Sequence, residues 1–275
     1  MVDVDYSYVN CKTALSLSRL PGLYYSLNPY FGCEHGCVYC YSRSVFRDRE
    51  VALSWGRFVK AKSNILDVLS REVTRKPPRV VGVSTVTDPY QPYESRLQLT
   101  RRCLEMLSRH NFPVSIQTKS ALVLRDLDLI KPDNFDVGVT LTTMDPGLAS
   151  RLEPRASRPD ARANVLEEFA SRHVKTWIFL GPIIPYVNDR EDSISQIIEI
   201  ASKTKSRLLF DKLNLRPWVL ESMRPFMESE CPGVWDRLPG LVGGKSDYWA
   251  SLSSLIRKIC ANDNVSCESA FPPQS

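Results

Sequence analysis

The chain has 275 residues, of which 43% are hydrophobic and 24% are charged; this composition supplies a large apolar core and excludes long disordered or repetitive stretches. No apolar run reaches the roughly 18 residues that cross a bilayer, and residues 1–6 do not resemble a signal peptide, so we expect no membrane span and a cytoplasmic location. The formal net charge of +5 suits a polyanionic partner, although basic residues scattered over solvated helix faces give the same total.

Short apolar runs bounded by turn residues alternate with amphipathic stretches, and this pattern predicts repeated βα units that build a parallel sheet. The predicted strands span residues 23–27, 80–84, 114–118, 136–141, 175–180 and 207–213, and the predicted helices span residues 64–73, 97–109, 159–172 and 192–204. Right-handed crossovers wind such units either toward a barrel or into an open sheet, and six strands are too few for a full eight-stranded barrel. In both architectures a ligand binds at the carboxyl ends of the strands.

Three segments follow from this reading. Residues 1–20 form an N-terminal extension, and residues 21–215 form the α/β core. Residues 216–275 begin with proline-rich turns and end in a helix at 248–259. Because no flexible linker precedes it, we expect this last segment to pack on the core and to cover the barrel or its open edge.

Eight cysteines without a secretory signal argue against a disulfide framework and favour thiolate chemistry or core packing. Cys33, Cys37 and Cys40 lie within eight positions on a glycine-containing loop directly after the first predicted strand. Three convergent thiolates suit zinc or an iron–sulfur cluster. A structural zinc site usually takes four ligands, of which His35 would have to be one, whereas three thiolates suit a [4Fe–4S] cluster with one open iron. Cys103 falls among leucines of a predicted helix and reads as a core thiol.

The C-x3-C-x2-C spacing, with Tyr39 directly before the last cysteine, resembles the signature of the radical SAM superfamily. The resemblance implies a partial (β/α)6 barrel in which Cys33, Cys37 and Cys40 hold a [4Fe–4S] cluster. It also implies S-adenosylmethionine (SAM) as second cofactor, cleaved reductively to a 5′-deoxyadenosyl radical that abstracts hydrogen from a substrate. An external electron donor such as a ferredoxin or flavodoxin would be a partner.

Further motifs resemble the spore-photoproduct-lyase-like group, whose members are often labelled DNA repair photolyases, over roughly residues 20–215. The motifs include Thr87-Asp88-Pro89-Tyr90-Gln91-Pro92, Thr118-Lys119-Ser120 and Glu153-Pro154-Arg155. The resemblance assigns to SAM the residues Tyr39, Thr87, Asp88, Lys119, Thr142, Gly181 and Ile183. It places toward the substrate the residues Tyr90, Gln91, Glu153 and Arg155.

Several of these assignments have a plainer alternative. Thr142 is equally an ordinary β-branched residue at a strand end, and Tyr90 is equally a packing residue. The Thr87–Asp88 pair is also typical of a turn or a helix cap. Lys119 is equally well explained as a solvated surface lysine, and the segment from Gly181 as a rigid turn. Glu153 and Arg155 also suit a salt bridge at the surface.

The sequence therefore predicts a radical SAM enzyme, either lyase-like or a transferase, that acts on an unidentified substrate, with nucleic acid as the first candidate. Thr85 stands where the lyase has a cysteine that returns a hydrogen atom, and a threonine hydroxyl is a poor hydrogen-atom donor, which argues against repair of the thymine lesion by that route. The alternatives are radical modification of a protein, peptide or small metabolite, and a non-catalytic module that binds zinc or a cluster.

Overall fold

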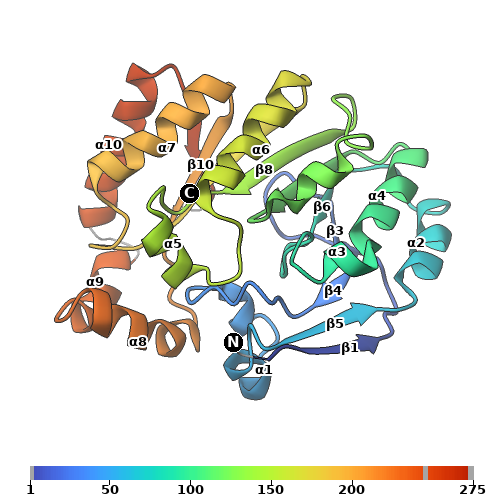
Figure 1. Ribbon diagram of the computed structural model, residues 1–275, viewed down its shortest axis with the longest axis horizontal. Helices are drawn as coiled ribbons and strands as arrows, with labels where there is room; N and C mark the ends of the chain where they lie inside the picture. Colours follow the sequence, from blue (N-terminus) through green and yellow to red (C-terminus); the bar gives the residue numbers. More distant parts are fainter. Residues whose placement is uncertain (1–2, 244–246, 272–275) are drawn as a thin grey trace.

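A computed structural model describes residues 3–243 and 247–271. Its main sheet has the strand order β11-β10-β9-β8-β7-β6-β3-β2 and curves through the centre of the molecule (Figure 1). The six inner strands are mutually parallel and match the six predicted strands: β3 (Tyr25–Leu27), β6 (Val81–Val83), β7 (Val114–Thr118), β8 (Phe135–Thr140), β9 (Lys175–Ile183) and β10 (Arg207–Lys212). The predicted partial (β/α)6 barrel is confirmed.

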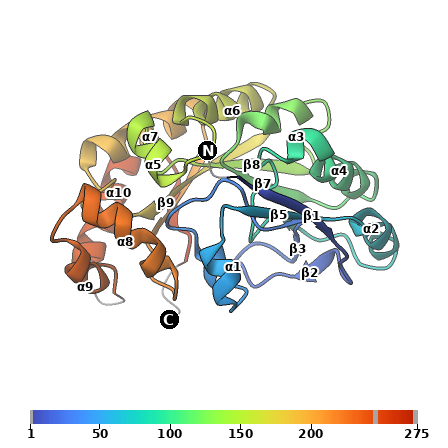
Figure 2. The same cartoon turned by 60° about the horizontal axis from the view of Figure 1, so that its bottom comes forward.

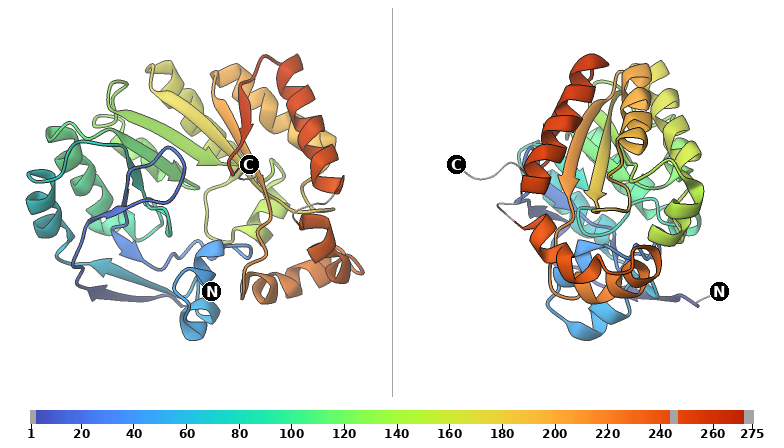
Figure 3. Two further views of the ribbon diagram at one scale, coloured as in Figure 1. Left: turned by 180° about the vertical axis from the view of Figure 1, so that it is seen from behind. Right: turned by 90° about the vertical axis from the view of Figure 1, so that its left-hand side faces the viewer.

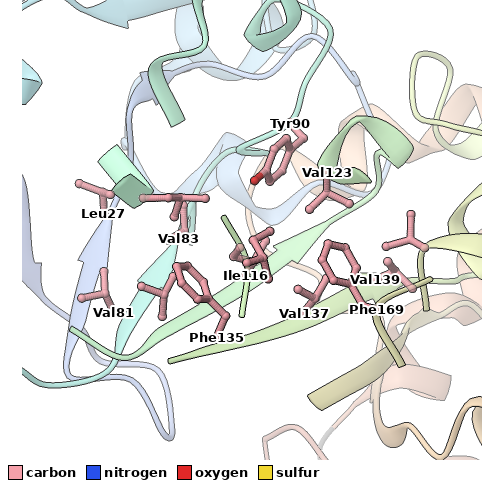
Figure 4. Close-up of a cluster of buried hydrophobic side chains, with 14 of the residues drawn as sticks. Leu27, Val81, Val83, Tyr90, Ile116, Val123, Phe135, Val137, Val139 and Phe169 are labelled. Carbon is pink, nitrogen blue, oxygen red and sulfur yellow. The ribbon is translucent and has the colours of Figure 1, made fainter. Parts of the chain in front are cut away.

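The outer face of this sheet is covered by helices whose apolar side chains recur three and four residues apart. These helices are α2 (Ile65–Val73), α4 (Leu99–Arg109), α6 (Pro159–Ser171) and α7 (Glu191–Thr204). The short helix α3 (Glu94–Leu97) precedes α4 and has Leu97 as its apolar residue. Figure 4 shows Val137 and Val139 of β8 beside Phe169 of α6, all fully buried. In α4 the predicted core thiol of Cys103 is also fully buried.

A second, three-stranded sheet with the order β1-β5-β4 lies beside the barrel (Figure 2). It consists of β1 (Asp5–Val9), β4 (Tyr30–Phe31) and β5 (Phe58–Lys62), and the short helix α1 (Arg49–Leu53) precedes β5. Sequence reasoning missed these strands because β1 is largely exposed and β4 has only two residues, so neither produces an apolar run.

The segment after β10 folds into α8 (Val219–Glu230), α9 (Leu238–Val242), α10 (Asp247–Asn262) and β11 (Cys267–Ser269) (Figure 3). The strand β11 pairs in parallel with β10 and so covers that edge of the sheet, and the antiparallel strand β2 (Leu15–Leu17) covers the other edge beside β3. The division into an extension, a core and a covering segment stays a prediction. None of the helices in the described ranges is long and apolar enough to cross a membrane.

Two of the remaining elements border the carboxyl ends of the strands. The helix α5 (Pro146–Leu152) follows β8 and begins at Asp145, whose carboxylate accepts hydrogen bonds from the backbone N–H groups of Gly147 and Leu148. The 3-10 turn η1 (Tyr41–Ser44) follows the third cysteine of the loop. The others are η2 (Ala121–Asp126) and η3 (Trp235–Arg237).

Candidate functional site

The three cysteines of the loop after β3 lie at the carboxyl-end edge of the parallel sheet. All three are free thiols; Cys33 and Cys37 are buried and Cys40 is half-buried. Burial raises the pKa of Cys37 to about 12, and it also raises the pKa of Cys33, an effect to which the charge of Asp88 and then those of Cys37 and Cys40 add. The three sulfur atoms therefore share one buried environment, in which a bound cationic group would take the place of the protons.

The cysteine loop is held against the turn before β5 by close backbone contacts. A Cβ atom on Gly56 would lie 2.8 Å from the Cα atom of Gly36, and Gly56 has a φ of +92°. On Gly32 a Cβ atom would lie 2.5 Å from the carbonyl oxygen of Phe58. Glycine is required at these positions because a side chain would push the loop out of place.

Polar side chains fix the same loop from two directions. The backbone N–H of Glu34 donates to Oε1 of Gln91 over 2.9 Å, and the hydroxyl of Tyr6 donates to Oε2 of Glu34 over 2.7 Å. Nη1 of Arg155 donates to the carbonyl oxygens of Glu34, over 3.0 Å, and Gly56, over 2.6 Å. Gln91 and Arg155, which the sequence places toward a substrate, thus hold the loop.

Glu153 is buried beside the cysteine loop and does not lie at the surface. It is 2% exposed, its Oε1 accepts a hydrogen bond from the hydroxyl of Tyr39, and its Oε2 forms an ion pair of 2.5 Å with Nη1 of Arg162. The pairing at the surface that the sequence allows for Glu153 is therefore wrong. Sequence reasoning missed Arg162 because an arginine inside an amphipathic helix normally marks its solvated face.

Asp88 follows β6 and joins it to the end of β7. Its Oδ1 accepts from the hydroxyl of Thr118 over 2.7 Å and from the backbone N–H of Tyr90 over 2.9 Å, and its Oδ2 accepts from the backbone N–H of Lys119 over 2.8 Å. Burial alone would raise the pKa of Asp88, but the neighbouring His35 and these hydrogen bonds lower it to about 2. Asp88 is therefore a buried anion at neutral pH.

The other residues that the sequence assigns to SAM surround this anion and the cysteine loop. Thr87 donates its hydroxyl to the carbonyl oxygen of Gly32 over 2.6 Å. The ammonium nitrogen of Lys119 lies 5.8 Å from the centre of the Tyr39 ring. Burial acts against the charge of Lys119, but Cys37, Glu153 and Asp88 outweigh it and raise its pKa.

Of the residues assigned to SAM, Gly181 and Ile183 lie on β9, and Thr142 lies just beyond the end of β8. The hydroxyl of Thr142 is buried and has no hydrogen-bond partner among the residues that the structure describes. A Cβ atom on Gly181 would lie 2.6 Å from the ring of Phe179, and Ile183 is 1% exposed. An orphaned buried hydroxyl at a strand end is the kind of group that a ligand satisfies.

Tyr90, the aromatic residue placed toward the substrate, is fully buried. Its hydroxyl donates to Oδ2 of Asp126 over 3.0 Å, and the guanidinium of Arg125 lies 5.8 Å from its ring centre. Tyr90 thus packs inside the protein. In contrast to Tyr90, Tyr41 of the cysteine loop is 40% exposed, and its hydroxyl donates to the carbonyl oxygen of Thr85.

The donor set of the loop fits an iron–sulfur cluster. A [4Fe–4S] cluster takes one thiolate per iron, so its ligands need not converge on a single point. Within the described ranges, no three His, Cys, Asp or Glu side chains are arranged around a single metal ion. Bound by three thiolates, the cationic iron–sulfide core would become a complex of net negative charge, which the nearby cation Lys119 suits.

A partial parallel barrel with three cysteines on the loop after its first strand defines a class of cofactor-dependent barrel proteins. The family model of the radical SAM superfamily matches residues 27–197, more than half of the chain. The chain belongs to the radical SAM superfamily, and membership implies a [4Fe–4S] cluster and SAM as cofactors.

Relatives with similar sequences come from archaea and bacteria. The protein MJ0683 of Methanocaldococcus jannaschii is 27% identical over 261 residues, which cover 94% of this chain and 95% of the relative. The protein Rv2578c of Mycobacterium tuberculosis is 30% identical over 226 residues, which cover 78% of this chain and 66% of the relative.

Solved structures share the fold at low sequence identity. Spore photoproduct lyase complexed with dinucleoside spore photoproduct has a TM-score of 0.69 and 14% identity, with 96% of this chain and 81% of that chain covered. SuiB of Streptococcus suis bound to S-adenosylmethionine has a TM-score of 0.57 and 13% identity, with 100% and 54% covered. The resemblance to the spore-photoproduct-lyase-like group is thereby confirmed at the level of the fold.

Proposed function

We propose that this radical SAM enzyme holds its [4Fe–4S] cluster with Cys33, Cys37 and Cys40. The observation that carries the proposal is the position of the three free thiols, two of them buried, at the carboxyl-end edge of a superfamily barrel. When bound, the cluster supplies the electron for cleavage of the SAM sulfonium, with methionine and a 5′-deoxyadenosyl radical as products. An external donor such as a ferredoxin or flavodoxin provides that electron.

The residues around the loop bind and orient SAM. We assign its carboxylate to the ammonium of Lys119, whose charge the surrounding acidic groups stabilise. Thr142 offers its unpartnered hydroxyl to the same ligand, and Tyr39, Gly181 and Ile183 border the adenine.

Asp88 and Thr87 have their polar atoms engaged within the protein. Since Asp88 accepts the backbone N–H of Lys119, we assign it the task of placing that lysine. Thr87 holds the loop through the carbonyl oxygen of Gly32. Both residues therefore act by positioning the groups that meet SAM.

Nucleic acid is the substrate class that we propose for the radical. Support comes from the fold likeness to spore photoproduct lyase, whose complex contains a dinucleoside spore photoproduct, and from the net charge of +5. Thr85 occupies the place where a cysteine would return a hydrogen atom. We therefore expect a reaction on nucleic acid other than thiol-dependent repair of the thymine lesion.

The test is the formation of 5′-deoxyadenosine by anaerobically reconstituted protein with SAM and a strong reductant. Cys37→Ala should abolish the product, whereas Cys103→Ala, which removes an equally buried thiol outside the site, should retain it. Loss of product in both variants, or zinc in place of iron in the purified protein, would contradict the assignment of the cluster loop.

A binding experiment separates the substrate classes. Single- and double-stranded oligonucleotides should bind with an affinity that falls linearly with salt on a double-logarithmic plot. Absence of salt-dependent binding would exclude nucleic acid and favour a protein, peptide or small-molecule substrate.

A further inference from the structure

The buried ion pair of Glu153 and Arg162 has no role in the binding of SAM as proposed above. Glu153 ends α5 and Arg162 lies in α6, and both side chains are almost fully buried, at 0% and 2% exposure. Arg162 also donates to the carbonyl oxygens of Ser157, over 2.6 Å, and Thr140, over 3.0 Å. The pair is therefore rigidly placed and shielded from water.

This pair is attached directly to the cysteine loop. The hydroxyl of Tyr39, which stands between Cys37 and Cys40, donates to Oε1 of Glu153. One residue away, the backbone N–H of Val38 donates to the carbonyl oxygen of Leu152 over 3.0 Å. Two adjacent residues of the loop are thus bound to the end of α5.

The charges of the pair act on the sulfur atoms of the loop. Oε1 of Glu153 accepts the hydroxyl of Tyr39, the residue directly before Cys40, and Oε2 of Glu153 pairs with Arg162, so both charges lie next to the loop. Because Glu153 and Arg162 bear opposite charges, their effects on the loop oppose each other, and other cations beside the loop include Lys119 and the buried Arg43. A group bound by the thiols would sense any change in this balance in a medium of low dielectric constant.

We propose that Glu153 is a positioning residue that holds Tyr39, and that its negative charge offsets the charge of Arg162 and so keeps the reduction potential of the cluster low. This inference rests on the proposed function. Removal of the carboxylate charge alone leaves the arginine charge uncompensated. A positive charge favours the reduced, more negative form of the cluster. Removal of both charges restores the balance.

The experiment measures the potential of the cluster in anaerobically reconstituted full-length protein without SAM, by redox titration followed by electron paramagnetic resonance. At an effective dielectric constant of about 20, a unit charge on the order of 10 Å away changes a one-electron equilibrium roughly tenfold. Glu153→Gln should therefore move the potential by about 59 mV in the positive direction. The double variant Glu153→Gln/Arg162→Met should return close to the wild-type potential.

A matched control lies at the start of the same helix. The side chain of Arg158 is 70% exposed, so water screens its charge and Arg158→Met should leave the potential unchanged. Should Glu153→Gln fail to fold, Arg162→Met, which leaves the carboxylate charge uncompensated, should move the potential by a similar amount in the negative direction, and an unchanged potential in this variant overturns the compensation. A double variant whose one-electron reduction equilibrium differs from that of the wild type by about tenfold overturns the proposal.

Equal potentials in the wild type and Glu153→Gln would also overturn the inference, because a purely structural role predicts no shift. Iron and sulfide contents are measured on every sample. If the wild type takes up neither iron nor sulfide, the proposed function itself fails. If the wild type binds the cluster but Glu153→Gln does not shift its potential, only the role of Glu153 fails, so the two failures are distinguishable.

Discussion

The carboxylate of Asp88 offers a quantitative test of how the loops at the carboxyl ends of β6 and β7 are joined. Asp88→Asn keeps the shape of the side chain but replaces one acceptor oxygen by an NH₂ group. An NH₂ group cannot accept a hydrogen bond, so either the hydroxyl of Thr118 or the backbone N–H of Lys119 loses its acceptor, depending on which oxygen is replaced. The pKa of Asp88 is about 2 instead of its ordinary 3.8, and this difference corresponds to about 2.4 kcal/mol of stability at neutral pH. We expect Asp88→Asn to lower the free energy of unfolding by about 2–3 kcal/mol.

Urea denaturation of the protein without cofactors measures this loss. A lowered pKa in the folded state means that the contribution of Asp88 is complete above the unfolded pKa of 3.8 and is lost as the pH falls toward about 2. Between pH 7 and pH 3 the wild type should lose about 1 kcal/mol from this carboxylate. Asp88→Asn should lack that part of the pH dependence.

Asp128 is a matched control because its pKa is also lowered to about 2, by the hydrogen bonds from Arg101. Its side chain is 64% exposed, so solvent screening should reduce the effect of Asp128→Asn to about 0.2–1 kcal/mol. Equal losses in the two variants, or a wild-type stability for Asp88→Asn, would refute the reasoning that burial makes the Asp88 interactions strong.

Three further predictions concern the loop and the last barrel strand. Gly56→Ala should destabilise the protein by at least about 2 kcal/mol in urea denaturation, because Gly56 has a φ of +92° and the new Cβ atom would lie 2.8 Å from Gly36. Arg155→Ala should cost about 1.5–3 kcal/mol and lower the iron content after reconstitution, since the carbonyl oxygens of Glu34 and Gly56 lose a charged donor. Burial raises the pKa of Asp211 to about 6 from 3.8, so its ionisation weakens the fold as the pH rises through 6. Asp211→Asn should therefore stabilise the protein by about 1–2 kcal/mol at pH 8 after a discount for partial exposure, and the gain should vanish toward pH 4.

The predictions for Gly56 and Arg155 each have a control variant. A Cβ atom on Gly240 would meet nothing within 4 Å, so Gly240→Ala should be neutral or slightly stabilising. Arg158→Ala removes an exposed arginine and should change neither stability nor iron content. A Gly56→Ala protein as stable as Gly240→Ala, unaltered iron uptake in Arg155→Ala, or a pH-independent gain in Asp211→Asn would each contradict the structural reason given.

Local pattern was enough to find the six barrel strands and the helices between them. A parallel strand buried on both faces is a continuous apolar run, and a covering helix repeats its apolar side chains every three to four residues. The spacing of Cys33, Cys37 and Cys40 is equally local, because it lies on one loop. Strands β1 and β4 left no such trace, since they are short or largely exposed.

The sequence by itself thus determined the fold class, the superfamily and the loop on which the chemistry is expected. Only the tertiary structure decided what the polar residues around that loop do. It buried Tyr90 and Glu153, turned Arg155 toward the carbonyl oxygens of the loop, and brought Arg162 to Glu153 from the next helix. The physical reason is that hydrogen bonds and ion pairs depend on distances across the fold between residues far apart in the chain, and a linear pattern of residue types does not contain those distances.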